Sequence, residues 1–202
     1  IKVSREAFNK LLGISNFKLK LNTVISEVVM DSKAIAAIGN STKNGDVVIK
    51  IGKITNSTLS EDIMTQIGAK QGCRFEVRVG DAIITDFKDS LFKISIPYIP
   101  NKNETKNSII SYCIKNDQAS KIADGRYNID ANMMEITSKY YPMFYIGYNE
   151  VTFNDIPQNA WYKDAVDFFA ARDIVLGNEN KRFEPDSNIK RADFLMLTMK
   201  AY

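Results

Sequence analysis

Hydrophobic and polar residues alternate along much of the first 150 positions, a pattern typical of strands with one buried face. Clear examples are residues 17–22, 74–79 and 91–96. Short polar turns, such as the one at Gly80-Asp81, separate several of these segments and predict hairpins. We therefore predict roughly eight to ten short strands in a mainly antiparallel β-sandwich or a distorted barrel.

Short helices interrupt this pattern. One is predicted to begin after Asp31, a good N-cap, and to end before Gly39. Another is predicted between Ser60 and Gly68 for the same reasons, and Ser4 is a candidate N-cap near the start of the chain. The first part of the chain is thus predicted to be β-rich with a few short helices.

The last quarter of the chain, from Val151 onward, has the spacing of two amphipathic helices joined by a loop. The first is predicted to begin near Asn159 and to bury one face, made of Trp161, Ala165, Phe168, Phe169 and Arg172. The second begins near Arg191 and is apolar on nearly all sides. A short helix of this kind needs partners on more than one face.

Together these patterns predict an α+β protein of two domains, with a β-rich domain at residues 1–149 and a helix-loop-helix at 150–202. The length of 202 residues and the hydrophobic content of 45% agree with packed, globular domains. No Gly/Ser/Pro-rich linker separates the two parts, so we expect them to pack together or to be rigidly joined. Because the chain begins with Ile1 and stops within a predicted helix, we interpret it as a piece of a longer precursor.

The distribution of charge and the length of the apolar stretches argue against two classes of partner, nucleic acid and membrane. The net charge of +3 combines 7 basic and 8 acidic residues from Val151 onward with 20 and 16 before it. The basic residues alternate with apolar ones instead of clustering on one element, so nucleic acid is not a predicted partner. No apolar stretch approaches the ~20 residues of a membrane-spanning helix, so no membrane span is predicted.

The chain contains no histidine, which excludes Ser-His-Asp and Cys-His nucleophile systems and zinc sites that need histidine. No calcium-loop motif occurs, and neither a metal nor another cofactor is predicted. Cys73 and Cys113 are either a disulfide between neighbouring strands or two small buried thiols, and the sequence does not decide between them.

An enzymatic alternative depends on carboxylates alone. Glu76, Asp81, Asp86 and Asp89 lie near one predicted hairpin, and two suitably spaced carboxylates can hydrolyse glycosides. Acidic residues in turns more commonly stabilise the turn itself. We therefore expect a protein that is not an enzyme and keep a glycoside hydrolase as a distant alternative.

The C-terminal segment carries an ordered set of residues that resembles an S-layer homology repeat. About ten positions agree in order and spacing over some fifty residues. They include Phe153, Asp155, Trp161, Ala165-Val166, Ile174-Val175, Gly177, Phe183, Pro185-Asp186, Ile189 and Arg191-Ala192-Asp193. The resemblance implies an extracellular protein of the cell wall or S-layer.

The resemblance also implies a partner and a site. In this family, three repeats form a bundle, and the grooves between them bind a pyruvylated secondary cell-wall polysaccharide. Arg191 would then bind the carboxylate of the polymer, and Trp161 would form an apolar wall for a sugar ring. Asp155 would accept a hydrogen bond from a sugar hydroxyl. Gly177 belongs to the same set. We interpret both Gly177 and Pro185 as residues required by the backbone conformation, and at Gly177 we expect a left-handed turn.

Each of these residues also has a structural interpretation. Trp161 at helical spacing is more often a core anchor, Asp155 could brace the loop before the first helix, and Arg191 could be an ordinary solvated residue. Three positions depart from the family pattern. Lys190 and Asp193 replace the Thr and Glu of a capping box, and Asp173 replaces a Gly that precedes Ile-Val. One repeat cannot complete a groove between repeats, so further repeats of the same or a neighbouring chain are expected as partners.

The β-rich part is similar to a module that precedes these repeats in many clostridial surface proteins. The similarity lies in Ile94–Tyr98, Tyr112, Asp124–Tyr127 and Ile146–Val151, while the usual His of a nearby segment is absent and Tyr140–Phe144 stands in its place. We expect this part to be a structural spacer. The alternative is a module that itself binds carbohydrate or a protein.

Overall fold

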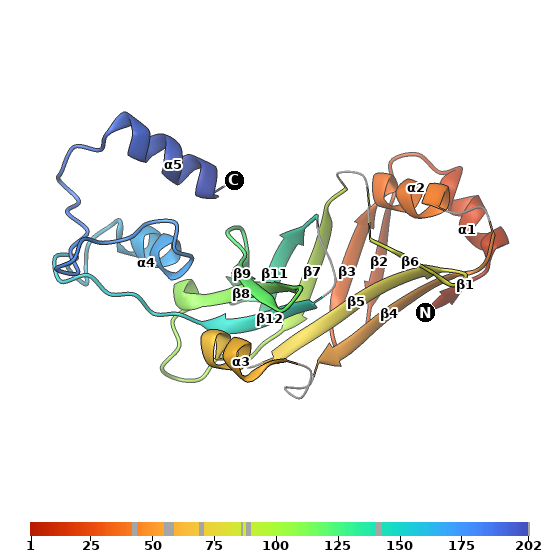
Figure 1. Ribbon diagram of the computed structural model, residues 1–202, viewed down its shortest axis with the longest axis horizontal. Helices are drawn as coiled ribbons and strands as arrows, with labels where there is room; N and C mark the ends of the chain where they lie inside the picture. Colours follow the sequence, from red (N-terminus) through yellow and green to blue (C-terminus); the bar gives the residue numbers. More distant parts are fainter. Residues whose placement is uncertain are drawn as a thin grey trace.

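The computed structural model describes residues 1–41, 44–54, 59–68, 71–85, 87, 90–139 and 143–201. In this part of the chain, two antiparallel sheets and three short helices form a β-rich body, and the chain then leaves it for α4 and α5 (Figure 1). The mainly antiparallel architecture with short helices, predicted from the alternation of hydrophobic residues, is confirmed.

The larger sheet contains seven described strands. Six follow one another in the order β1, β4, β5, β12, β8 and β9, and β6 pairs with residues 77–79 of β5. Their bounds are Lys2–Val3, Val47–Ile54, Gln71–Val79, Met143–Tyr148, Ile109–Lys115, Gln118–Lys121 and, for β6, Ala82–Ile84.

The smaller sheet contains five described strands in the order β10, β11, β7, β3 and β2. Their bounds are Arg126–Asn128, Met133–Ser138, Phe92–Pro97, Glu27–Asp31 and Lys18–Asn22. Pro97 is the last residue of β7, as expected for a residue that cannot donate to a strand ladder.

One apolar cluster lies between the two sheets. It joins inward residues of the larger sheet, such as Ile49, Phe75 and Phe144, to Ile94 and Met134 of the smaller sheet. All five side chains are at most 1% exposed. This shared core holds the sheets together, because burial of large apolar side chains is the main favourable term in folding.

Helices α1 (Arg5–Leu12) and α2 (Ser32–Ser41) pack on one end of this core. Ser4 caps α1 as predicted, with its hydroxyl accepting from the Ala7 amide at 3.2 Å. The predicted end of α2 at Gly39 is wrong, because the helix continues to Ser41. A Cβ on Gly39 would lie 2.7 Å from the Leu12 side chain, so this glycine permits close packing of the two helices.

Helix α3 (Glu61–Ile67) covers part of the outer face of the larger sheet. Ser60 caps its start, and Gly68, in the left-handed conformation with φ of 53°, ends it, as predicted. A second apolar cluster lies beneath it and includes Ile67, Tyr112 and, from α4, Ala171. The C-terminal segment is therefore connected to the outer face of this sheet.

The two cysteines are free thiols. Both lie opposite Phe144 of β12, Cys73 on β5 and Cys113 on β8, so one strand separates them. Two strand spacings are about 9.6 Å, too far for a disulfide. Burial raises the pKa of the Cys73 thiol to about 12.

Candidate functional site

Helix α4 (Lys163–Ala171) begins three residues later than the Asn159 cap predicts, because its N-cap is Tyr162. Residues 157–163 form two successive turns, in which Ala160 N donates to Pro157 O at 3.1 Å and Lys163 N donates to Ala160 O at 3.0 Å. The residue before α4 is Tyr162, and its side chain makes no capping hydrogen bond. Trp161 therefore lies in a turn and not on the helix.

Arg172 attaches the end of α4 to the β-rich body. It is only 4% exposed, and its guanidinium donates to Gly125 O at 2.6 Å, Ile109 O at 3.1 Å and Asn107 O at 3.0 Å. The guanidinium also stacks on the Phe168 ring at 3.5 Å from its centroid. Backbone carbonyls of α4's neighbours thus surround one buried cation.

Burial, together with the nearby positive charge of Arg126, lowers the pKa of Arg172 to about 10. This is well above neutral pH, so the guanidinium keeps its charge and its full set of donors. The helical spacing predicted that Arg172 lies on the buried face of α4, but it did not predict which backbone carbonyls would accept its hydrogen bonds. Those come from segments more than forty residues away.

Further polar contacts strengthen this attachment. Asn149 Nδ2 donates to Ala171 O at 2.7 Å at the end of α4. Lys121 Nζ lies 2.7 Å from the Asp173 carboxylate, and Lys106 Nζ lies 3.5 Å from that of Asp164. Asp173 has φ of 57°, so it adopts the left-handed backbone conformation that the Gly of the family pattern would take more easily.

Asp155 braces the loop that follows α4. Its two carboxylate oxygens accept from the backbone amides of Phe183 and Glu184, both at 2.8 Å, and Arg182 Nε lies 3.7 Å away. Burial opposes ionisation, but the two amide bonds outweigh it and lower the pKa of Asp155 below its usual range. Asp155 is therefore a structural brace, but of the loop after α4 and not of the loop before it, as the sequence had suggested.

The predicted left-handed turn at Gly177 is wrong, because its φ is not positive. A Cβ at this position would lie 2.4 Å from the Phe153 ring and 3.0 Å from Arg182 O. Phe153 in turn packs against Phe183, with ring centroids 5.6 Å apart. Gly177 is therefore needed for the close approach of an aromatic ring and not for its own conformation.

Trp161 is 93% exposed, so its interpretation as a core anchor is wrong. It forms the rim of an open groove of about 410 Å³, whose other lining residues include Phe169, Val175, Phe183 and Pro185. The side chains that α4 buries are instead Val166, Ala170 and Ala171. An exposed indole beside a largely apolar groove is a surface suited to a ring-shaped ligand.

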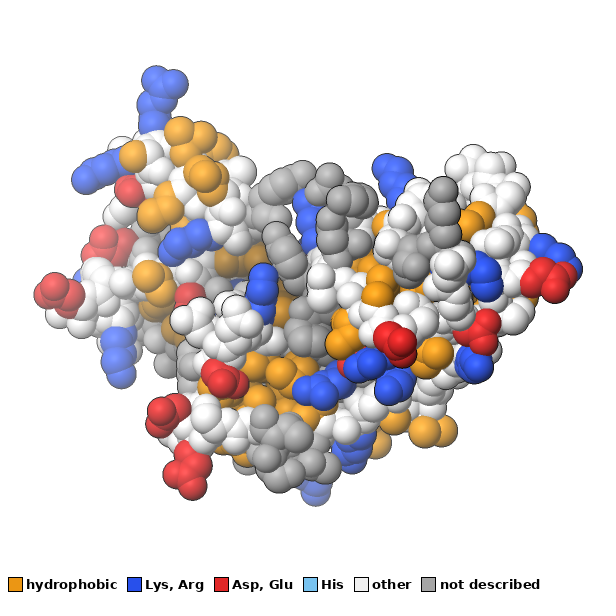
Figure 2. Space-filling model, turned by 45° about the vertical axis from the view of Figure 1, so that its right-hand side comes forward, with side chains coloured by type: hydrophobic (Ala, Val, Ile, Leu, Met, Phe, Trp, Pro, Cys, Tyr) orange, Lys and Arg blue, Asp and Glu red, His pale blue; other side chains and the backbone are white. Residues whose placement is uncertain are grey.

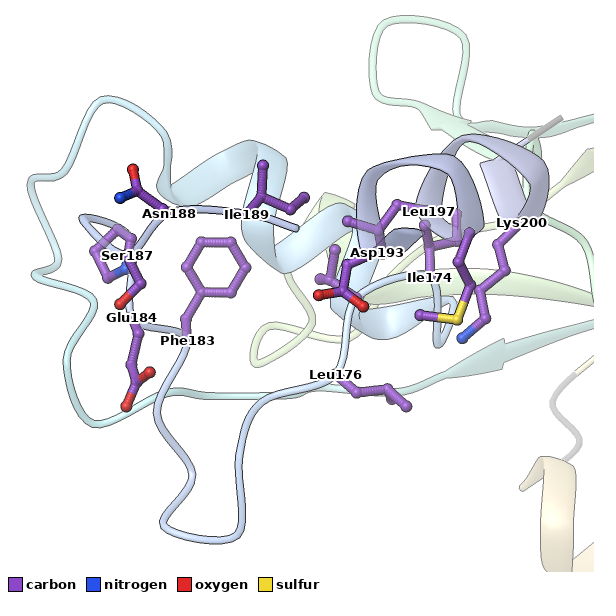
Figure 3. A pocket seen from close by; sticks show the side chains of 13 residues that line it. Ile174, Leu176, Phe183, Glu184, Ser187, Asn188, Ile189, Asp193, Leu197 and Lys200 are labelled. Carbon is purple, nitrogen blue, oxygen red and sulfur yellow. The ribbon is translucent and has the colours of Figure 1, made fainter. Parts of the chain in front are cut away.

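A second cavity, of about 570 Å³, lies between the loop and helix α5 (Arg191–Ala201). Figure 3 shows Phe183 and Ile189 at one side of it and Asp193, Leu197 and Lys200 of α5 at the other. It shares Phe183 and Pro185 with the groove beside Trp161.

Helix α5 buries none of its described residues. Phe194, Leu195 and Met199 are 58%, 61% and 80% exposed, and Figure 2 shows hydrophobic side chains on the surface of this part of the molecule. Lys200 Nζ approaches Asp173 O at 3.4 Å. The prediction of an apolar helix in need of neighbours agrees with this exposure.

The four predicted binding residues are not gathered at one point. Asp155 and Gly177 both shape the loop around Phe183, and Trp161 lines the groove that Phe183 also lines. Arg191 is exposed at the start of α5 and lines neither of the two cavities described above.

The carboxylates considered for catalysis are only partly described. Glu76 accepts from Arg78 Nε at 2.7 Å, which lowers its pKa and keeps it ionised. Asp81 lies in the turn after β5, while Asp86 and Asp89 fall outside the described residues. Among the residues that the structure describes, no three Cys, Asp or Glu side chains are grouped as metal ligands, and no helix is long and apolar enough to cross a membrane.

Comparison with known proteins identifies the segment that contains these grooves. Residues 152–195 match the family model of the S-layer homology domain. The resemblance predicted from Phe153, Asp155, Trp161 and Arg191 is thereby confirmed for this segment. The resemblance of the β-rich part to a preceding module stays a prediction.

Three curated proteins are similar to parts of the chain. They are exoglucanase XynX of Acetivibrio thermocellus (42% identity over 50 residues), endo-1,4-beta-xylanase A of Thermoanaerobacterium saccharolyticum (40% over 50) and amylopullulanase of Thermoanaerobacterium thermosulfurigenes (22% over 102). The matches cover 25%, 25% and 50% of this chain, but only 4%, 4% and 5% of those proteins. No solved structure matches significantly.

Proposed function

We propose that residues 150–202 are a cell-wall anchoring repeat and that residues 1–149 are a separate domain that acts as a spacer. The observation that carries this proposal is the match of residues 152–195 to the S-layer homology domain. Such domains bind cell-wall polysaccharide and occur in extracellular proteins of the cell wall and S-layer. The attachment is non-covalent and involves no turnover.

Within the repeat, we assign polymer contact to Trp161 and Arg191. The indole of Trp161 is exposed beside an apolar groove and has no role in the core, so it is free to stack against a sugar ring. The exposed guanidinium of Arg191 can bind the carboxylate of a pyruvylated polymer with two hydrogen bonds.

Asp155 and Gly177 receive supporting roles in this proposal. The Asp155 oxygens already accept backbone amides of the loop, and Gly177 makes room for Phe153. Both residues hold Phe183 in place, and Phe183 forms part of the groove wall. Their replacement should disturb the groove without removing a direct contact.

Further repeats of the same or a neighbouring chain complete the site. The exposed apolar residues of α5, including Phe194, Leu195 and Met199, support this partner, because such surface favours burial. The polymer would then be bound between repeats, with Trp161 and Arg191 facing it from this one.

Co-sedimentation of the full-length protein with purified cell-wall sacculi tests the proposal. Trp161→Ala and Arg191→Ala should each weaken binding about tenfold, since a charge-assisted or stacking contact contributes about 1–3 kcal/mol. Trp161→Phe should restore part of the lost binding. Lys10→Ala on exposed α1 removes the same charge at the far end of the molecule and should have no effect (Figure 1).

The proposal is wrong if the unaltered protein stays in the supernatant. It is also wrong if the sacculi retain both alanine variants as well as they retain the unaltered protein.

A further inference from the structure

The outer face of the larger sheet is covered by α3 at one end and carries a shallow groove on β4 and β5. The groove has a volume of about 460 Å³ and is lined by Lys50, Ile51, Gly52, Arg74, Glu76 and Arg78. Figure 2 shows Lys and Arg side chains gathered in a row across the lower middle of one face of the molecule.

Positive charge is in excess in this groove. Three cationic side chains face one carboxylate, that of Glu76, which lies 2.7 Å from Arg78 Nε and 3.8 Å from Lys50 Nζ. Hydrogen bonding by Arg78 lowers the pKa of Glu76, so this carboxylate is ionised at neutral pH and offsets only one of the three charges.

Unlike Lys50 and Arg78, Arg74 forms no ion pair within the described part of the chain, although its charge also helps to lower the pKa of Glu76. Within the described part of the chain, its guanidinium makes one hydrogen-bond contact, to the Met143 sulfur at 3.5 Å. A thioether is a weak acceptor, and a guanidinium carries five N–H donors. Arg74 therefore presents an exposed, planar donor group toward the groove, suited to binding a carboxylate or a phosphate.

Gly52 lies opposite Arg74 in the interior of β4. Its φ is not positive, and a Cβ built on it would meet nothing within 4 Å, so neither backbone conformation nor close packing requires glycine here. By contrast, a Cβ on Gly72 of β5 would lie 2.7 Å from the Tyr145 ring. A glycine inside a strand costs stability, and one reason to keep it is the close approach of a ligand.

We propose that this groove binds a strand of anionic polysaccharide. Acidic groups of the polymer would pair with Arg74 and Lys50, and the sugar backbone would pass over the floor that Gly52 leaves open. The described lining contains no aromatic side chain on which bases could stack, which favours an acidic glycan over nucleic acid. This site lies outside residues 152–195 and is independent of the anchoring repeat.

Binding of the full chain to defined polymers at low ionic strength tests the proposal. Polygalacturonate supplies carboxylates, polyglycerol phosphate supplies phosphates and dextran is neutral. We expect binding to at least one acidic polymer and none to dextran. The polymer that is bound more tightly shows whether the groove prefers carboxylates or phosphates. Arg74→Gln and Gly52→Val should each weaken it about tenfold, since each removes or blocks a charge-assisted contact.

Control variants distinguish specific binding in the groove from a general attraction of the positively charged chain for acidic polymers. Lys18→Gln removes one charge from exposed β2 of the other sheet and should change binding less than twofold. Gly52→Val should unfold at the same or a higher temperature, because valine favours strands and the space is open. Lys10→Gln on α1 lies outside both the groove and residues 152–195 and should also leave binding unchanged, so a loss confined to Arg74→Gln and Gly52→Val assigns the binding to the groove.

Three results would overturn the proposal. One is binding of neither acidic polymer, and another is equal binding by Arg74→Gln, Gly52→Val and the unaltered chain. The third is tighter binding of poly(dT), lost in the same variants, which would make the groove a nucleic-acid surface.

Discussion

Hydrophobic side chains are buried in the β-rich body but exposed on the final helix, α5. Ile94 and Ile96 of β7 are at most 1% exposed, whereas Leu195 and Met199 of α5 are 61% and 80% exposed. The body completes its core with its own strands, while no described part of the chain buries a residue of α5. The β-rich body is therefore stabilised by its own buried side chains, whereas the exposure of α5 is what the proposed packing against a further repeat requires.

The connection between the two regions differs from both. It adds polar contacts to the apolar packing of Ala171, with Arg172 donating to carbonyls of the body and Lys121 paired with Asp173. Such contacts have directional requirements that apolar packing lacks. They therefore orient α4 on the body more than they add to the core.

The largest effect should come from the shared core. Ile94→Ala removes a buried side chain between the sheets and should lower the free energy of unfolding by about 2–5 kcal/mol. The matched Leu195→Ala on α5 should change it by less than about 0.5 kcal/mol, because most of that side chain is exposed. Urea unfolding of both variants measures the comparison. Similar losses would mean that α5 is packed in solution.

A smaller loss is expected at the connection. Arg172→Met keeps the size of the side chain but leaves carbonyls of Gly125, Ile109 and Asn107 without their donor, which should cost about 3 kcal/mol. Arg126→Met removes an exposed cation 5.5 Å from the same Phe168 ring and should cost less than about 1 kcal/mol. Urea unfolding again provides the readout, and equal effects would contradict the role of Arg172.

The pH dependence of Arg172 gives a second check on this connection. Its pKa is lower in the folded protein, about 10 against an ordinary 12.5, so the folded state loses its proton first as pH rises. The cost of burying the charge is therefore constant below pH 10 and is relieved only above it. Between pH 6 and 9, where Arg172 is charged in both states, the difference between Arg172→Met and the unaltered chain should stay constant.

The smallest and most local effect is expected at Asp155. Its pKa is lowered in the folded state, so the stability from its amide bonds is present above the ordinary pKa of 3.8 and is lost as pH falls through the folded value. In Asp155→Asn, only one side-chain oxygen remains to accept the two amide hydrogen bonds. The amide hydrogens of Phe183 and Glu184 should therefore exchange faster with solvent at neutral pH.

Hydrogen exchange measured by NMR between pH 2 and 7 follows both amides. Asp81→Asn in the turn after β5 is the control and should leave them unchanged. Unchanged exchange in Asp155→Asn would show that the loop is held by the Phe153–Phe183 contact instead.

Local features of the fold were predictable because neighbouring residues cause them. Alternation and the Gly80-Asp81 turn predicted β5 and its hairpin with β6, and the caps at Ser4, Ser60 and Gly68 were all found. Gly39 and Gly177 were misread for one shared reason. Each makes room for a side chain that is distant in sequence, Leu12 and Phe153, and a local pattern carries no information about such contacts.

The candidate site shows the same division. The order of Phe153, Asp155, Trp161 and Arg191 was enough to predict the family of this segment, which the family match confirms. The exposure of Trp161 was not predictable from helical spacing, because the helix begins two residues after it. The groove beside it depends on Phe183, which Asp155 and the Phe153 ring hold in place.

By itself, the sequence determined the strand pattern, the short capped helices and the identity of the C-terminal segment, since each depends on residue types at short and regular spacing. Only the tertiary structure decided that Cys73 and Cys113 stay apart, that Arg172 joins α4 to the body and that Gly52 opens a cationic groove. These outcomes depend on which distant segments become neighbours. That choice follows from how both sheets bury their apolar faces in one core.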